Sequence, residues 1–183
     1  MREVRDSACI LKLLWSYSRR RFIAASATAL GFPTIIPATA IGKGGRPAPS
    51  ERITVASIGF GTIAIKWTPN FLRDPRCQVV AIADVMKEAG HYGYEGELTG
   101  GRDAGKRMVD AHYKADTCKA YADFRTMLDK EDIDAVQIAT PDHWHAYQTI
   151  YCARKGIHCY TQKPLGLTIG EERMMIEIGR AHV

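Results

Sequence analysis

The sequence predicts an α/β protein with a doubly wound parallel sheet, and three observations support this class. From Glu51 onward, short apolar runs alternate with amphipathic stretches, as expected for strands joined by right-handed helical crossovers. An apolar, β-branched run at residues 53–58 leads straight into a glycine-rich turn at 59–64. A second apolar run at residues 79–83 ends in an acidic residue, Asp84.

The elements follow in order along the chain. The predicted strands are residues 53–58, 79–83, 119–121, 135–139 and 157–161. Residues 90–101 hold five glycines and show no periodicity, so we expect an exposed loop there. Asp123 and Asp142 are the expected N-caps of the third and fourth helices. The predicted helices are residues 62–72, 103–113, 123–128, 144–155 and 169–179.

The turn after the first strand has the G-x-G-x-x-A pattern of a dinucleotide-binding turn. Gly59 permits a tight strand-to-helix turn, Gly61 lets the backbone approach a pyrophosphate, and Ala64 lets the helix lie close to the strand. Asp84, twenty residues beyond Ala64, is placed to accept hydrogen bonds from ribose hydroxyls. The alternative is a glycine-rich turn that binds nothing. The predicted nucleotide contacts here are Gly59, Phe60, Gly61, Thr62, Ile63 and Asp84.

The acidic residue also bears on which dinucleotide is expected. A carboxylate at Asp84 would repel a 2′-phosphate, so the sequence predicts NAD, with NADP less favoured. Lys87 lies close enough in sequence to soften that preference.

Charge and cysteine content exclude several classes of protein. The chain has 183 residues and a net charge of +5, but residues 1–42 carry +4 of it. The remainder is nearly neutral and has no basic stripe with interleaved aromatic residues, so nucleic acid is not an expected partner. The five cysteines show no C-x-x-C spacing, which argues against a zinc site and favours buried or half-buried thiols.

Residues 1–42 are interpreted as an export signal. Ser18-Arg-Arg-Arg-Phe-Ile23 resembles a twin-arginine signal, and the weakly apolar run behind it ends in small residues typical of a cleavage site. This predicts a partner, the twin-arginine export machinery, and a periplasmic location. The alternative is an uncleaved membrane anchor. Residues 43–50 are a predicted flexible linker, and residues 51–183 are the predicted nucleotide-binding domain.

Two further strand ends carry polar residues, where doubly wound sheets bind their ligands. Thr140 and Pro141 follow the strand at 135–139, and Trp144 and His145 open the next helix. His143 and His145 are two residues apart and do not share a helical face, so we predict no metal site. His145 is a candidate donor to a cofactor oxygen, and a surface capping cluster is the alternative.

The last strand ends in Gln162-Lys163-Pro164. A lysine on a proline-fixed turn is held in place, so Lys163 is the candidate catalytic residue: it can bond a substrate hydroxyl and favour its deprotonation during hydride transfer. An ordinary solvated lysine is the alternative.

Together these stretches resemble the Gfo/Idh/MocA oxidoreductase family, in its exported branch. The resemblance covers residues 53–172, and the block at 140–145 followed by Lys163-Pro164 is its strongest part. It is carried by Gly59-Phe-Gly61, Asp84, Cys118–Arg125, Asp132–Val136, Ala139–Ala146 and Gln162–Leu165.

The resemblance implies a Rossmann-type domain and an NAD(P)-dependent oxidoreductase that acts on a sugar, cyclitol or polyol. It places Thr140, Pro141, Trp144, His145, Gln162 and Lys163 around the cofactor, with Lys163 matching the lysine of the family's Glu-Lys-Pro motif. Gln162 departs from the usual glutamate and removes a negative charge beside the lysine, although an amide still accepts a hydrogen bond.

Family members carry a C-terminal α/β substrate domain, for which we find no counterpart before Val183. We therefore expect a truncated chain that is inactive alone and could form a homo-oligomer only with that domain. Two other functions stay open: an NAD-dependent, redox-assisted glycoside hydrolase, and a non-catalytic dinucleotide-binding fragment.

Overall fold

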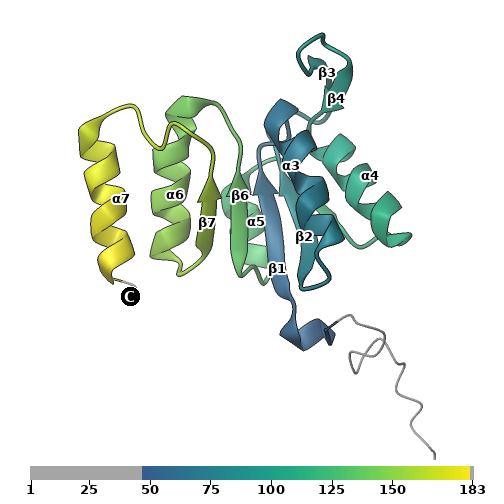
Figure 1. Ribbon diagram of the computed structural model, residues 1–183, viewed down its shortest axis with the longest axis horizontal. Coiled ribbons are helices and arrows are strands. Elements are labelled where there is room, and N and C mark those ends of the chain that lie inside the picture. The colour runs from purple at the N-terminus through teal and green to yellow at the C-terminus, as the bar shows by residue number, and fades with distance from the viewer. Residues whose placement is uncertain (1–46, 182–183) are drawn as a thin grey trace, which may run out of the picture. The chain divides into compact units, whose positions relative to one another are not determined.

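The computed structural model describes residues 47–181, which fold around a five-stranded parallel sheet (Figure 1). The strand order is β5-β2-β1-β6-β7, so the chain winds outward in both directions from β1. This confirms the predicted doubly wound sheet. The strands are β1 (Ile53–Ile58), β2 (Cys77–Ala83), β5 (Lys119–Tyr121), β6 (Ala135–Ile138) and β7 (His158–Thr161).

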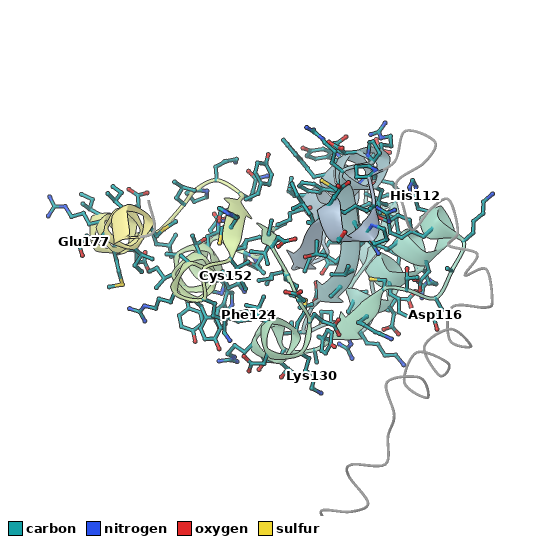
Figure 2. The ribbon with its side chains drawn as sticks, turned by 90° about the horizontal axis from the view of Figure 1, so that it is seen from below. His112, Asp116, Phe124, Lys130, Cys152 and Glu177 are labelled. Atoms are coloured by element: carbon teal, nitrogen blue, oxygen red, sulfur yellow. The ribbon has the colours of Figure 1, made fainter. Side chains whose placement is uncertain are left out.

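Helices cover both faces of the sheet. One face packs against α3 and α4, and the opposite face packs against α5 and α6, while α7 lies against α6 (Figure 1). Figure 2 shows Phe124 of α5 and Cys152 of α6 in one layer, with Glu177 of α7 beyond them. The helices are α3 (Thr62–Arg73), α4 (Arg102–Tyr113), α5 (Phe124–Lys130), α6 (His145–Arg154) and α7 (Ile169–Ala181).

Each face of the sheet has its own apolar core. On the α5/α6 face the central side chains include Ile58, Met127 and Ile138, and on the α3/α4 face they include Phe60, Ile82 and Val109. Burial of these aliphatic and aromatic groups is the main stabilising contribution to the fold, at about 1.5–3 kcal/mol for each large side chain. Polar side chains also occur within the strands, where Ser57 of β1 and Gln137 of β6 are buried.

The prediction of a loop at residues 90–101 is wrong as secondary structure, although half of these residues are exposed. This stretch forms most of an antiparallel hairpin of β3 (Ala89–Tyr92) and β4 (Leu98–Gly100). Its glycine content masked the strand pattern because glycine gives no apolar alternation. The hairpin lies between β2 and α4 in the chain and folds back onto the turn after β1.

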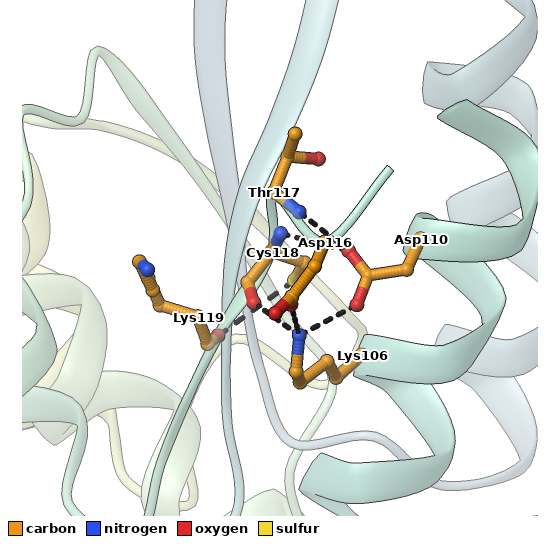
Figure 3. Close-up of polar contacts among 6 residues, drawn as sticks. All are labelled: Lys106, Asp110, Asp116, Thr117, Cys118 and Lys119. Atoms are coloured by element: carbon orange, nitrogen blue, oxygen red, sulfur yellow. Dashed lines mark hydrogen bonds and ion pairs between the residues drawn. The ribbon is translucent and has the colours of Figure 1, made fainter. Parts of the chain in front are cut away.

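A partly exposed polar network ties α4 to the segment that leads into β5 (Figure 3). Lys106 Nζ donates to Asp110 Oδ2 at 2.6 Å, to Asp116 and to the Cys118 carbonyl oxygen at 3.0 Å. The other carboxylate oxygen of Asp110 accepts the N–H groups of Thr117 and Cys118, each at 2.9 Å. The network therefore fixes the segment through which the chain returns to the sheet.

Capping was predicted correctly in one place and wrongly in another. Asp123 accepts the N–H of Arg125 at 2.9 Å and caps α5, as expected. Asp142 does not cap α6: it opens the short 3₁₀ turn Asp142–Trp144, and Trp144 is the N-cap residue without a side-chain bond. The 3₁₀ turn runs directly into α6, and the N-terminus of α6 has no side-chain cap.

The predicted export signal, residues 1–42, lies outside the described residues, as does the first half of the predicted linker, residues 43–46. Residues 47–50 lead into the 3₁₀ turn Pro49–Glu51, and Arg52 donates to the Pro47 carbonyl oxygen at 3.0 Å. Among residues 47–181, no helix combines the length and apolar character needed to cross a membrane. The four cysteines in this range are free, two of them buried and two half-buried, which confirms the interpretation as thiols.

Candidate dinucleotide-binding site

The register of the sheet brings the carboxyl ends of its strands level with one another. Ile58 of β1 pairs with Ala83 of β2 on one side and with Ile138 of β6 on the other. Ile138 in turn pairs with Thr161 of β7, and Ala83 with Tyr121 of β5. The turns that follow these strands therefore begin side by side along one edge, in the order Ala122, Asp84, Gly59, Ala139 and Gln162.

The first glycine of the turn is required by its geometry. Gly59 has a φ of +82°, in the left-handed region that other residues seldom adopt. A Cβ at this position would lie 2.8 Å from Thr140 Cγ2 and 2.9 Å from the Ala139 carbonyl oxygen. Because β1 and β6 approach so closely here, only glycine lets the chain turn from β1 into α3.

The carboxylate of Asp84 holds the glycine-rich turn in place. Its Oδ2 accepts the N–H of Phe60 at 2.7 Å, and its Oδ1 accepts the N–H of Met86 at 2.8 Å. A carboxylate has about four acceptor positions, so each oxygen keeps one for a ligand hydroxyl. Asp84 thus links the turns after β1 and β2 and still faces the site.

The N-terminus of α3 fits a phosphate group. Gly61 is the N-cap residue and supplies no side-chain cap, and no acidic residue stands in the first turn. The N–H groups of a first helical turn lack partners within the helix, and the helix dipole favours an anion at that end. The site therefore has the donors and the field that a pyrophosphate requires.

The β3–β4 hairpin packs on this turn. The ring of Tyr92 lies over Gly61, where a Cβ would come within 3.0 Å of Tyr92 Cε1. Gly93 N–H donates to Thr62 Oγ1 at 2.8 Å, and Gly101 N–H donates to the Phe60 carbonyl oxygen at 2.8 Å. Burial first, and then the charge of Asp84, raise the pKa of Tyr92, so its hydroxyl stays a neutral donor.

A cavity of about 510 Å³ opens along the edge of the sheet. Most of the residues predicted to bind a nucleotide line it, whereas the predicted contacts His145, Gln162 and Lys163 do not. The lining residues that were predicted are Gly59, Phe60, Gly61, Thr62, Ile63, Asp84, Thr140, Pro141 and Trp144.

Several lining residues were missed by the sequence analysis. Ala122, Asp123, Phe124 and Arg125 follow the carboxyl end of β5, so the strand-end rule applied to the other turns would have found them. Arg125 lies over the Phe124 ring, 5.4 Å from its centre, and pairs with Asp123 at 3.0 Å. Tyr92, Val85, Met86 and Gln148 also line the cavity, without a sequence signal that distinguishes them.

The buried His145 lies beside Thr140, which is half-buried and lines the cavity. The His145 ring is fully buried, with Nε2 at 2.8 Å from the Thr140 carbonyl oxygen and Nδ1 at 2.6 Å from the Pro164 carbonyl oxygen. Thr140 Oγ1 donates to Gln148 Oε1 at 2.7 Å. Both ring nitrogens are thus occupied within the protein, which favours an indirect role for His145 over direct contact with a cofactor.

Gln162 and Lys163 stand at the end of the neighbouring strand. Gln162 N–H donates to the Ile138 carbonyl oxygen at 2.9 Å, and Gln162 Oε1 accepts the N–H of Lys163 at 2.8 Å. The Lys163 side chain is exposed. Its predicted contacts with cofactor and substrate stay predictions. Within residues 47–181, no group of three or more His, Cys, Asp and Glu side chains is arranged to hold a metal ion.

A comparison with protein families identifies the family of this chain. Residues 53–182 match the model of the Gfo/Idh/MocA family, described as an oxidoreductase family with an NAD-binding Rossmann fold. The chain is a member of the Gfo/Idh/MocA family. The match covers the whole sheet and every residue of the candidate site.

The chain also resembles part of a curated protein. A glycosyl hydrolase family 109 protein from Saccharopolyspora erythraea is 28% identical over 123 residues, which are 66% of this chain and 24% of that protein. The chain therefore spans about a quarter of the length of this relative.

Solved structures share the fold. A myo-inositol 2-dehydrogenase from Lactobacillus plantarum has a TM-score of 0.56 at 22% identity, with 72% of this chain and 34% of that chain covered. The WlbA dehydrogenase from Chromobacterium violaceum, in complex with NADH and UDP-GlcNAcA, also has a TM-score of 0.56, at 21% identity over 75% of this chain and 34% of that chain.

Proposed function

We propose that this chain is the nucleotide-binding part of an oxidoreductase that transfers a hydride between a nicotinamide and a hydroxyl of a sugar, cyclitol or polyol. The observation that carries the proposal is the alignment of five strand ends, which sets the glycine turn and Asp84 on one cavity and Lys163 at the end of a nearby strand. The dehydrogenases with the same fold support the reaction class.

Each group of site residues has its own proposed role. The N–H groups at the start of α3 bind the pyrophosphate, and Asp84 accepts from the adenosine ribose hydroxyls. The nicotinamide ring, when bound, accepts or donates the hydride. Lys163 Nζ bonds the substrate hydroxyl oxygen and stabilises the negative charge that this oxygen gains as its proton passes to solvent and the hydride passes from carbon to the nicotinamide.

NAD is the proposed cofactor in preference to NADP. Asp84 lies at the end of β2, where a 2′-phosphate would meet its negative charge. Of the nearby cations, Lys87 lies 3.9 Å from Asp103, and Arg102 donates to the main-chain carbonyl oxygens of Asp84 and Val85, so neither of these contacts involves the Asp84 carboxylate.

A second candidate function is NAD-dependent, redox-assisted glycoside cleavage, which the family 109 relative favours. The two differ in the fate of the hydride: a dehydrogenase releases NADH, whereas a redox-assisted hydrolase returns the hydride in each cycle. Net NADH release with free sugar therefore separates them. We also propose that the 183 residues alone bind NADH without turning over a sugar, since the solved dehydrogenases are about three times as long as the matched part.

We further propose that residues 1–42 direct twin-arginine export to the periplasm. Twin arginines at 19–20, followed by a weakly apolar run, support this. A dinucleotide is made in the cytoplasm, so the protein would load its cofactor there and cross the membrane folded.

The cofactor proposal is tested by titrating the 183-residue chain with NADH and NADPH and following nicotinamide fluorescence. The wild type is expected to bind NADH more tightly. Asp84→Asn is expected to shift the NADH/NADPH affinity ratio by about tenfold toward NADPH, because it removes the repelling charge. Asp142→Asn makes the same charge change at an exposed position of the same edge and is expected to leave the ratio unchanged. A wild type that binds neither nucleotide contradicts the proposal.

A further inference from the structure

The lysine turn, residues 162–164, is attached to the rest of the fold by very few polar contacts. Before Lys163, the N–H of Gln162 bonds to β6 and the Gln162 side chain bonds the N–H of Lys163. After Lys163, the Pro164 carbonyl oxygen lies 2.6 Å from His145 Nδ1, and among the residues that the structure describes it has no other polar partner. The His145 ring therefore holds the C-terminal side of the turn.

Apolar packing does not replace this contact. Leu165 is 48% exposed and Leu167 is 60% exposed, so the residues that follow Pro164 are not buried anchors. The next polar anchor along the chain is the N–H of Leu167, which bonds to Glu171 on α7. Between these points the backbone depends on His145 for its position.

His145 itself is rigidly placed. It opens α6, its side chain is fully buried, and its second nitrogen, Nε2, lies 2.8 Å from the Thr140 carbonyl oxygen. The ring thus spans from the turn after β6, which lines the cavity, to the turn after β7, which carries the lysine. Both partners are acceptors: a neutral imidazole donates one of the two bonds, and an imidazolium donates both.

We propose that His145 is a positioning residue for Lys163: by bonding Pro164 it sets the lysine turn in register with the cavity-lining turn at Thr140. The inference rests on the proposed function, in which Lys163 is the residue that meets the substrate hydroxyl. A catalytic group must be held within about half an ångström of its working position, which an exposed turn with two anchors on one side does not provide.

Two amide substitutions separate the two contacts of the ring. His145→Asn places an amide N–H₂ where Nδ1 stands and keeps the bond to Pro164. His145→Gln reaches as far as Nε2 and keeps the bond to Thr140 instead. Both replace a buried ring by a smaller amide, so each is the control for the general loss of packing in the other.

The experiment measures the order of the Lys163 backbone in the free 183-residue chain by ¹⁵N relaxation, without any nucleotide. Lys163 is expected to be as ordered in the wild type and in His145→Asn as its neighbours in β7, and to show loop-like mobility in His145→Gln. Equal order in both variants, or equal loss in both, overturns the proposal, because a purely structural histidine would not distinguish the two amides.

A measurement on the wild type covers the case in which the variants do not fold. The Nδ1 proton of His145 is expected to be visible by NMR and protected from solvent exchange, because it is buried against the Pro164 carbonyl. A fast-exchanging or absent Nδ1 proton overturns the proposal. Neither the relaxation measurement nor the exchange measurement uses NADH. A failed nucleotide titration would therefore contradict the proposed function without contradicting the role of His145 in the lysine turn. In the full-length enzyme, the corresponding asparagine variant is expected to retain more of kcat than the glutamine variant at similar KM.

Discussion

The glycine turn, residues 59–62, and the lysine turn, residues 162–164, lie at the same edge of one sheet but are held in different ways. The glycine turn is fixed by Asp84 from β2, by the β3–β4 hairpin above it and by close contact with Thr140. The lysine turn is exposed and depends on its own glutamine and one buried ring.

This difference matches the separate roles proposed for the two turns, binding and chemistry. A nucleotide-binding turn must be preorganised, because loose backbone N–H groups would lose entropy on binding a phosphate. The lysine needs a defined backbone but a free ammonium group that can reach a hydroxyl. The glycine turn and Asp84 thus share a cavity with the turns after β5 and β6, whereas the lysine stands on a separate, lightly anchored turn.

The largest expected effect is on the glycine turn. Gly59→Ala places a methyl group in the left-handed region and 2.8 Å from Thr140, and we expect it to lower the free energy of unfolding by about 2–4 kcal/mol. NADH affinity is expected to fall at least about tenfold, because the N–H groups at α3 move with the turn. Urea unfolding and nicotinamide fluorescence measure the two effects.

The control is Gly156→Ala, at the end of α6. Gly156 has a φ of +75° but nothing lies within 4 Å of the position of its Cβ. Gly156→Ala therefore introduces the backbone strain without the steric clash. It is expected to lower the free energy of unfolding by about 1 kcal/mol and to leave NADH affinity unchanged. Equal effects of the two substitutions would show that the contact with Thr140 does not matter.

Sequence patterns predicted the elements that alternate clearly and missed the one that does not. The strand at 53–58 was predicted to the residue, and the helix after it to within one residue, because a β-branched run meets a glycine turn. The β3–β4 hairpin could not be predicted, since its fold depends on Tyr92 packing over Gly61 and not on a local apolar pattern.

The candidate site shows the same limit. Position along the sheet edge could be predicted from strand ends, and it placed nine predicted residues on the cavity. Side-chain direction could not: His145 follows the turn that lines the cavity, yet its ring points into the protein and bonds two carbonyl groups. A helix start gives the location of a residue, while tertiary packing decides which way it faces.

An intermediate effect is expected at the Lys106 network. Burial raises the pKa of Asp110, but the bonds from Lys106 and from two main-chain N–H groups outweigh it, so that pKa lies below its usual value. Asp110→Asn is expected to lower the free energy of unfolding at neutral pH by about 1–3 kcal/mol. Asp116→Asn, whose carboxylate meets the same lysine but is 87% exposed, is expected to change it by less than about 0.5 kcal/mol.

The pH dependence has a defined sign. A carboxylate whose pKa is lowered on folding contributes stability above its unfolded value, 3.8, and loses it as pH falls through the folded value. The difference between the wild type and Asp110→Asn should therefore be constant at neutral pH and shrink below pH 3.8. A difference that persists unchanged into acid would show that the carboxylate charge is not what holds α4 to β5.

The smallest expected effect on stability is at Lys163, on the exposed turn after β7. Lys163→Met removes an exposed ammonium group that makes no ion pair among the described residues, so the free energy of unfolding should change by less than about 0.5 kcal/mol. Lys155→Met is the matched control, because its ammonium pairs with Asp129 at 2.6 Å on the surface and should also cost little. If Lys163→Met instead lowers the free energy of unfolding by more than about 1 kcal/mol, the lysine side chain supports the fold. The proposed contrast between a preorganised glycine turn and a free lysine side chain would then be wrong. If stability is unchanged while turnover of the full-length enzyme is lost, the two turns differ as proposed: one is built to bind, and the other leaves its lysine free to react.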